Sequence, residues 1–114
     1  MCVFLGTTQV GSSGTGTSSE EVNLVNPAAG TYTVVVQGWG VVGSTPFKLH
    51  SWLLGDSAAG NMSVSAPATA SIGASGTVTL NFSGLSSGTK YLGSVVYGGA
   101  SGMPNPTIVR VDTP

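Results

Sequence analysis

Charged residues are scarce in this sequence. Three basic and four acidic side chains among 114 residues give a formal net charge of −1: Glu20, Glu21, Lys48, Asp56, Lys90, Arg110 and Asp112. A nucleic-acid-binding surface needs clustered lysine and arginine, which these scattered positions do not supply. Disorder is also disfavoured, because 40% of the residues are hydrophobic and the net charge is low. The composition predicts a folded chain that does not bind nucleic acid.

Cysteine and histidine occur once each, as Cys2 and His50. One cysteine cannot form a disulfide within the chain, and one cysteine with one histidine does not make a zinc site. No run approaches the roughly 18 apolar residues of a membrane-spanning helix. The opening residues Met1 to Leu5 are too short and uncharged for a signal peptide, so we expect any export signal to lie outside this sequence.

Strand-forming and turn-forming residues dominate what is there. Gly, Ser, Thr and Val make up more than half of the chain, and good helix formers are few. Short alternating segments recur about every ten residues between Gly, Ser and Pro turns, a pattern typical of a sandwich. We therefore predict an all-β protein, a small antiparallel β-sandwich of jelly-roll or immunoglobulin-like type that could consist of two packed halves.

The first half contains four candidate strands. Residues 3–10 indicate a short strand pair or a bent strand, and residues 20–27 alternate with Val22 and Leu24 on one face. Residues 28–39 give the strongest strand signal and are predicted to lie centrally, because β-branched residues occupy both faces. Residues 47–54 alternate again, with Phe47, Leu49, Ser51 and Leu53 predicted to face the core.

The second half is predicted to restart the strand pattern after a small, polar junction at residues 55–61. Candidate strands follow at 62–67, 76–85, 90–99 and 107–114. The predicted units are residues 1–55 and 61–114. The predicted core includes Val34, Val36, Leu49, Val78, Leu80 and Phe82.

A resemblance to a known family rests on residues 26–39, NPAAGTYTVVVQGW, followed by 47–55, FKLHSWLLG. These resemble the closing strands of the bacterial pre-peptidase C-terminal domain, a small jelly-roll-like β-sandwich. Residues 60–97 and the terminal TIVRVDTP resemble the segment that ends many secreted subtilisin-like serine proteases of bacteria. The resemblance implies a truncated pre-peptidase C-terminal-like unit over 1–55, an immunoglobulin-like β-rich unit over 61–114, and a secreted or extracellular location.

The resemblance also implies strands upstream of residue 3 that this sequence does not contain. An incomplete sheet exposes unpaired backbone groups along an edge. We expect such a chain to associate through a sheet edge, near residues 3–10 or 107–113.

Catalytic and metal-binding chemistry finds little support. His50 is the one candidate base, and no nucleophile motif accompanies it, so we predict a structural histidine. Glu20 and Glu21 beside a Ser/Thr/Gly loop could hold calcium weakly, but a solvated strand start is favoured. The run GSSGTGTSS at 11–19 has no P-loop lysine and precedes a strand pattern, so we predict a flexible hairpin loop rather than a phosphate site. No cofactor is predicted.

A candidate binding surface consists of Trp39, Lys48, His50 and Trp52. If the strands at 28–39 and 47–54 paired as a hairpin, both indoles could lie on one sheet surface, as in contacts with carbohydrate or extended peptide. The alternative is that Trp52 packs against the second half of the chain.

These observations leave two main hypotheses for function. The first is a non-catalytic accessory domain of a secreted bacterial protease, whose partners are the parent catalytic domain and an extracellular protein or polysaccharide. The alternative is a structural β protein that self-assembles into a homo-oligomer or extracellular fibre through its sheet edges. A small hydrolase is a distant third.

Overall fold

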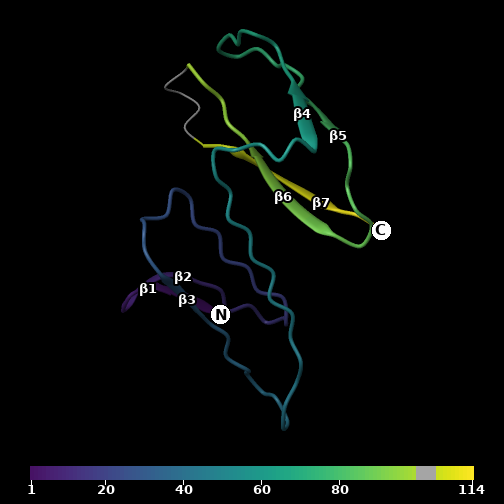
Figure 1. The fold of residues 1–114 in the computed structure, drawn as a ribbon. Coiled ribbons are helices and arrows are strands. Elements are labelled where there is room, and N and C mark those ends of the chain that lie inside the picture. Colours follow the sequence, from purple (N-terminus) through teal and green to yellow (C-terminus); the bar gives the residue numbers. More distant parts are fainter. Residues whose placement is uncertain (100–104) are drawn as a thin grey trace. The chain divides into compact units, whose positions relative to one another are not determined.

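The computed structural model describes residues 1–99 and 105–114, and in these residues every regular element is a strand (Figure 1). The all-β prediction is confirmed. The strands form three small antiparallel sheets. Their bounds are β1 Cys2–Leu5, β2 Thr8–Ser12, β3 Tyr32–Val35, β4 Met62–Ser65, β5 Thr79–Phe82, β6 Lys90–Val95 and β7 Thr107–Asp112.

The chain divides into two compact units, Met1–Lys48 and Leu49–Pro114. The junction expected at residues 55–61 lies inside the second unit. The domain boundaries read from the sequence stay a prediction.

The first unit is built on a three-stranded sheet in the order β2-β1-β3. A two-residue turn that begins at Gly6, with a φ of 59°, joins β1 to β2, and a bulge interrupts their register between Val3 and Phe4. The short strand pair predicted at residues 3–10 is therefore confirmed. A positive φ at the first turn residue suits glycine, which pays no steric penalty there.

The strand expected to be central is an edge strand. β3 covers four residues of the predicted segment and pairs with β1 on one side. β1 takes the central position because it accepts partners on both edges. After Val35 the chain leaves the sheet, and Gly40 and Gly43 adopt positive φ values of 70° and 73° in the loop that follows.

Residues 20–27 form no strand, but their predicted facing is correct. Val22 and Leu24 are half-buried, whereas Glu21 and Asn23 are exposed. Val22 lies so close to β2 that a Cβ built on Gly11 would come within 2.5 Å of its Cγ1. Asn26, with a φ of 48°, turns the chain before Pro27. The alternation reflects packing over β2 rather than ladder pairing.

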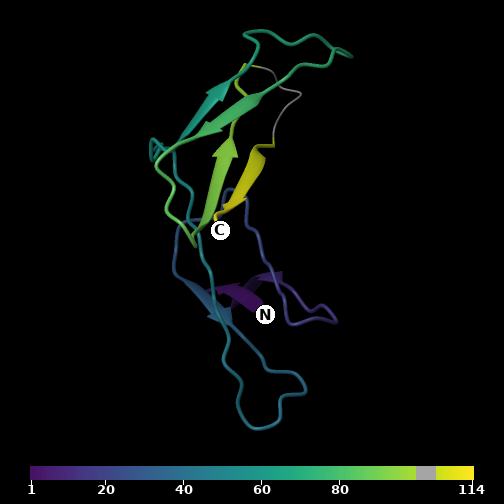
Figure 2. The ribbon, with the colours of Figure 1, turned by 90° about the vertical axis from the view of Figure 1, so that its right-hand side faces the viewer.

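The second unit contains two hairpins, β4-β5 and β6-β7, which Figure 2 shows as pairs of antiparallel arrows. In the first hairpin Met62 pairs with Phe82 and Val64 with Leu80, so the predicted apolar face is present. The Met62 side chain lies over β6, where a Cβ on Gly93 would sit 3.5 Å from the Met62 methyl group.

Residues 47–54 form no strand, contrary to the sequence prediction. The division between the two units falls within this segment. Its backbone has no partner in any of the described sheets, and alternation without a ladder does not make a strand.

The predicted core is largely wrong. Val34, Val36, Leu49, Val78 and Phe82 are all exposed, and Leu80 is half-buried. Among the described residues Val3, in the central strand, is the buried apolar side chain. The sheets of the described residues have two or three strands each, and the structure does not show a sandwich among them, so that part of the fold prediction stays a prediction.

The accessible surface is correspondingly large, at 9247 Å². Two separate compact bodies of the same total mass would expose roughly 7,000 Å². Large apolar side chains are exposed in both units, Trp39 and Val42 in the first and Leu53 and Ile72 in the second.

Candidate binding surface

Trp52 is held against β6 through its indole nitrogen. The Trp52 Nε1–H donates a hydrogen bond of 3.2 Å to the Lys90 carbonyl oxygen. Thr89 exchanges bonds with Thr113, on the β7 side, so the backbone groups of the next residue point away from β7. Trp52 therefore occupies the first acceptor on the open edge of β6.

His50 stacks on the same tryptophan. The imidazole and indole centroids lie 5.8 Å apart with an interplanar angle of 16°. Trp52 remains 44% exposed despite its hydrogen bond and the stacked ring. The pair presents an accessible aromatic surface whose orientation is fixed by contacts within the second unit.

Lys90, whose carbonyl oxygen accepts the Trp52 hydrogen bond, also forms an ion pair. Lys90 and Asp112 are opposite one another in the β6-β7 register, and Lys90 Nζ lies 2.7 Å from Asp112 Oδ2. Both side chains are well exposed, so the pair contributes little to stability.

Two of the four sequence-predicted surface residues, His50 and Trp52, are in contact within one unit. Trp39 and Lys48 belong to the first unit and are exposed, Trp39 by 90%, whereas His50 and Trp52 belong to the second. The hairpin that would align the indoles is absent, because β3 pairs with β1 and residues 47–54 form no strand. The alternative, that Trp52 packs against the second half, agrees with its bond to Lys90. The binding role of the four residues stays a prediction.

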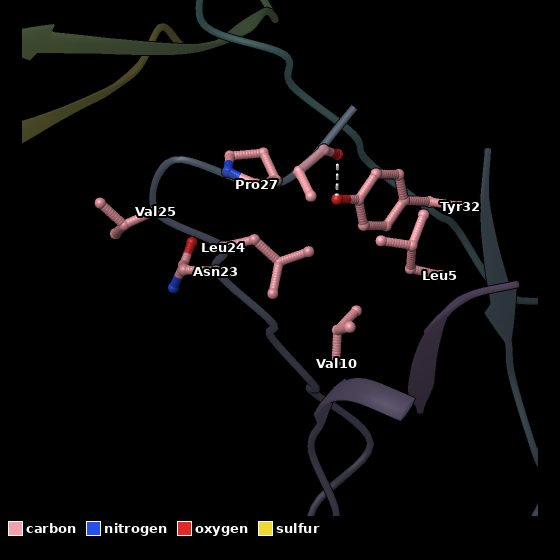
Figure 3. Close-up of a pocket in the computed structure, with 8 residues that line it drawn as sticks. Leu5, Val10, Asn23, Leu24, Val25, Pro27 and Tyr32 are labelled. Carbon is pink, nitrogen blue, oxygen red and sulfur yellow. Dashed lines mark hydrogen bonds between the residues drawn. The ribbon is translucent and has the colours of Figure 1, made fainter. Parts of the chain in front are cut away.

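A shallow apolar hollow of about 210 Å³ lies in the first unit (Figure 3). Aliphatic side chains line most of it, and the Tyr32 hydroxyl donates a 2.5 Å hydrogen bond to the Ala28 carbonyl at its rim. The lining residues are Leu5, Val10, Asn23, Leu24, Val25, Pro27, Ala28 and Tyr32. The sequence reasoning did not find this hollow, although the alternation around Leu24 and the PAAGTY turn both contribute to it.

Glu20, a residue weighed as a weak calcium ligand, forms hydrogen bonds within the 13–20 loop. Its carboxylate accepts hydrogen bonds from the Ser13 hydroxyl, from the Thr15 backbone N–H at 2.9 Å and from the Thr15 hydroxyl at 3.0 Å. The Ser13 hydroxyl, followed by the Thr15 N–H, lowers the pKa of Glu20. The carboxylate thus closes the 13–20 loop with the protein's own donors, which favours the structural interpretation.

No group of three or more metal-binding side chains comes together in residues 1–99 and 105–114. The same ranges contain no helix that could cross a membrane. No family model matches the chain, and neither do curated proteins or solved structures. Function must therefore be argued from the geometry of the aromatic surface and the sheet edges.

Proposed function

We propose that the chain is a non-catalytic accessory module of a secreted bacterial protease that binds extracellular polysaccharide through the His50–Trp52 surface. The observation that carries the proposal is the exposed Trp52 ring, which is oriented by its bond to Lys90 and by stacking with His50. An aromatic face bordered by polar groups suits the apolar C–H face of a sugar ring.

The neighbouring groups complete this chemistry. The indole N–H is already bonded, so the ring would contribute its face rather than a donor. Lys90, whose carbonyl oxygen accepts the indole hydrogen bond, and its ion-pair partner Asp112 carry a donor and an acceptor that we propose for the sugar hydroxyls. A preoriented ring loses little conformational freedom on binding, which favours affinity.

The remainder of the proposal is supported by the pattern of residues 26–39. Gly30 of the PAAGTY segment has a φ of 155°, and a Cβ there would approach Leu5 Cδ1 to 2.6 Å. Both the backbone angle and the close approach of Leu5 require glycine at this position. A turn motif that recurs in a family is expected to have such a structural requirement. The parent catalytic domain is the proposed partner, and an extracellular location is proposed with it.

Substitution of Trp52 tests the binding proposal. Titration with soluble peptidoglycan fragments should show saturable binding to the wild-type chain, and Trp52→Ala should weaken it about tenfold, because loss of one aromatic contact removes on the order of 1 kcal/mol. Isothermal titration calorimetry measures both affinities.

Trp39→Ala is the matched control. Trp39 is the other tryptophan and is 90% exposed, and the proposed binding surface does not include it, so its removal should leave the affinity unchanged. Absence of saturable binding to the wild type, or an equal loss in both variants, would show that this surface is not the binding site.

A second candidate function is self-assembly through sheet edges. It is favoured by the open edges of three small sheets and by the uncovered apolar surface of both units. The terminal strands were the expected edges. Residues 3–5 lie in the central β1, whereas residues 8–10 lie in β2 and residues 107–112 form β7. Both β2 and β7 are edge strands, as are β3 and the other hairpin strands.

A further inference from the structure

We propose that the outer edge of β3 pairs antiparallel with β3 of a second copy of this chain, with Val34 opposite Val34 across a two-fold axis. The inference rests on the self-assembly candidate and names the strand, the register and the partner. It would produce a six-stranded sheet in the order β2-β1-β3-β3-β1-β2.

The hydrogen bonds at the N-terminus show which backbone groups of β3 face outward. The Met1 amine and carbonyl both bond Ser13, on the β2 side. Backbone groups alternate in direction along a strand, so Cys2 and Phe4 point toward β3, where their partners are Val35 and Thr33. The N–H and C=O of Tyr32 and Val34 therefore point away from β1 to the open edge.

The composition of this edge permits pairing. No Asp, Glu, Lys or Arg occurs in residues 22–47, so no charge blocks the approach of another strand. Residues 31–36 are all β-branched or aromatic, which suits a pleated sheet. Val34, Val35 and Val36 are each more than 40% exposed.

Other edges are less suitable for pairing. The β6 edge is occupied by the Trp52 indole at Lys90, and β7 carries Arg110 and Asp112. The β4 and β5 edges are uncharged, but polar Ser and Asn side chains interrupt them. β3 therefore combines open backbone groups with the strongest strand-forming sequence.

The register follows from the outward groups. Residues that exchange both hydrogen bonds in an antiparallel pair must both face the partner. Centring the pair on Val34 satisfies this for Val34 itself and places Thr33 opposite Val35. Tyr32 then lies opposite Val36, the residue that follows β3. Every cross-strand pair is then aromatic or β-branched, without like charges. A second copy is favoured as the partner because two β3 edges offer each other matching backbone hydrogen-bond donors and acceptors.

Val34→Pro tests the edge directly. The N–H at this position is not used by the β1-β3 ladder, so the monomer should keep its sheet and its far-ultraviolet circular dichroism. The wild type should elute as a dimer in size-exclusion chromatography, and the variant should elute as a monomer. Val34→Thr, which keeps the N–H and the branched side chain, should remain a dimer.

Cross-linking tests the register without relying on the folding of the proline variant. In a Cys2→Ser background, Val34→Cys should form a disulfide-linked dimer on mild oxidation, because the paired Cα atoms lie about 5.5 Å apart. Val35→Cys should not, because the two copies of residue 35 are offset beyond the roughly 7 Å limit for a disulfide.

The outcomes separate this inference from the proposed functions. Persistent dimerisation of Val34→Pro, or equal cross-linking at residue 35, would overturn the β3 pairing and leave self-assembly through another edge. A monomeric wild type would overturn both the inference and the self-assembly candidate. Polysaccharide binding at Trp52 is measured separately and would not be affected by either result.

Discussion

At the scale of single residues, side-chain hydrogen bonds give structure to segments that lack a ladder. Glu20 closes the 13–20 loop through Ser13 and Thr15, and the Tyr32 hydroxyl closes the turn from Ala28. The sequence predicted a flexible loop at 11–19. Composition shows that such a loop is polar, but it does not show which donors meet the carboxylate.

The Glu20 contacts predict a pH dependence of the loop. Because the pKa of Glu20 in the folded chain is lowered from its ordinary value of 4.5, the ionised carboxylate stabilises the loop above that pH. This stabilisation should be lost as the pH falls through the lowered folded-state pKa. Ser13→Ala removes the largest cause of the shift, so carboxyl NMR should show the Glu20 titration midpoint moving upward.

The neighbouring substitution Ser12→Ala provides the control for this titration. Its hydroxyl is not among the donors to Glu20, so the midpoint should stay at the wild-type position. A midpoint that is unaffected by Ser13→Ala would contradict the assignment of the donor.

At the scale of elements, the local alternation of apolar and polar residues predicted which side chains are buried better than it predicted which strands pair. The sequence pattern correctly predicted the β1-β2 pair and the apolar face of the β4-β5 hairpin. It also predicted which side of residues 20–27 is half-buried, with Val22 and Leu24. The segment 47–54 alternates equally well and is not a strand. A strand requires a partner backbone, and a period of two does not identify that partner.

In the candidate site too, the sequence identified residues that are neighbours along the chain and missed those that only the fold brings close. His50 and Trp52 were predicted from their spacing, because residues two apart share one side of an extended chain. Lys90 and Asp112 were missed, since Lys90 is 38 residues from Trp52 in the sequence. Only the folded second unit brings these residues together.

The Gly30 turn gives a prediction at this scale. Gly30→Ala places a methyl group 2.6 Å from Leu5 Cδ1, so the Leu5 side chain must move, and it forces an L residue to a φ of 155°, which strains the turn before β3. We expect a loss of about 1–3 kcal/mol in the free energy of unfolding of the first unit. Urea denaturation, monitored by hydrogen exchange of the β1 amides, measures this free energy.

Gly14→Ala is the matched control, because Gly14 has open space around its Cα and no positive φ. Its unfolding free energy should stay within about 0.5 kcal/mol of the wild type. Equal stability of both variants would contradict the proposed role of the PAAGTY turn.

At the scale of the whole molecule, the chain has secondary structure without a sizeable core. One described apolar side chain, Val3, is buried, while Val42, Leu53, Trp39 and Ile72 are at least 90% exposed. Folded proteins of this size usually cover such residues. We therefore interpret the chain as a module that acts through surface contact, and association with another chain as the means of covering its apolar side chains.

Sedimentation equilibrium of the wild-type chain tests this central claim most directly. The mass should rise above 11.3 kDa with concentration in the micromolar range. Because backbone pairing and apolar burial would hold the assembly, it should persist from about 0.1 M to about 1 M salt, where ion pairs are screened beyond roughly 3 Å. A single species of 11.3 kDa at every concentration would contradict the claim.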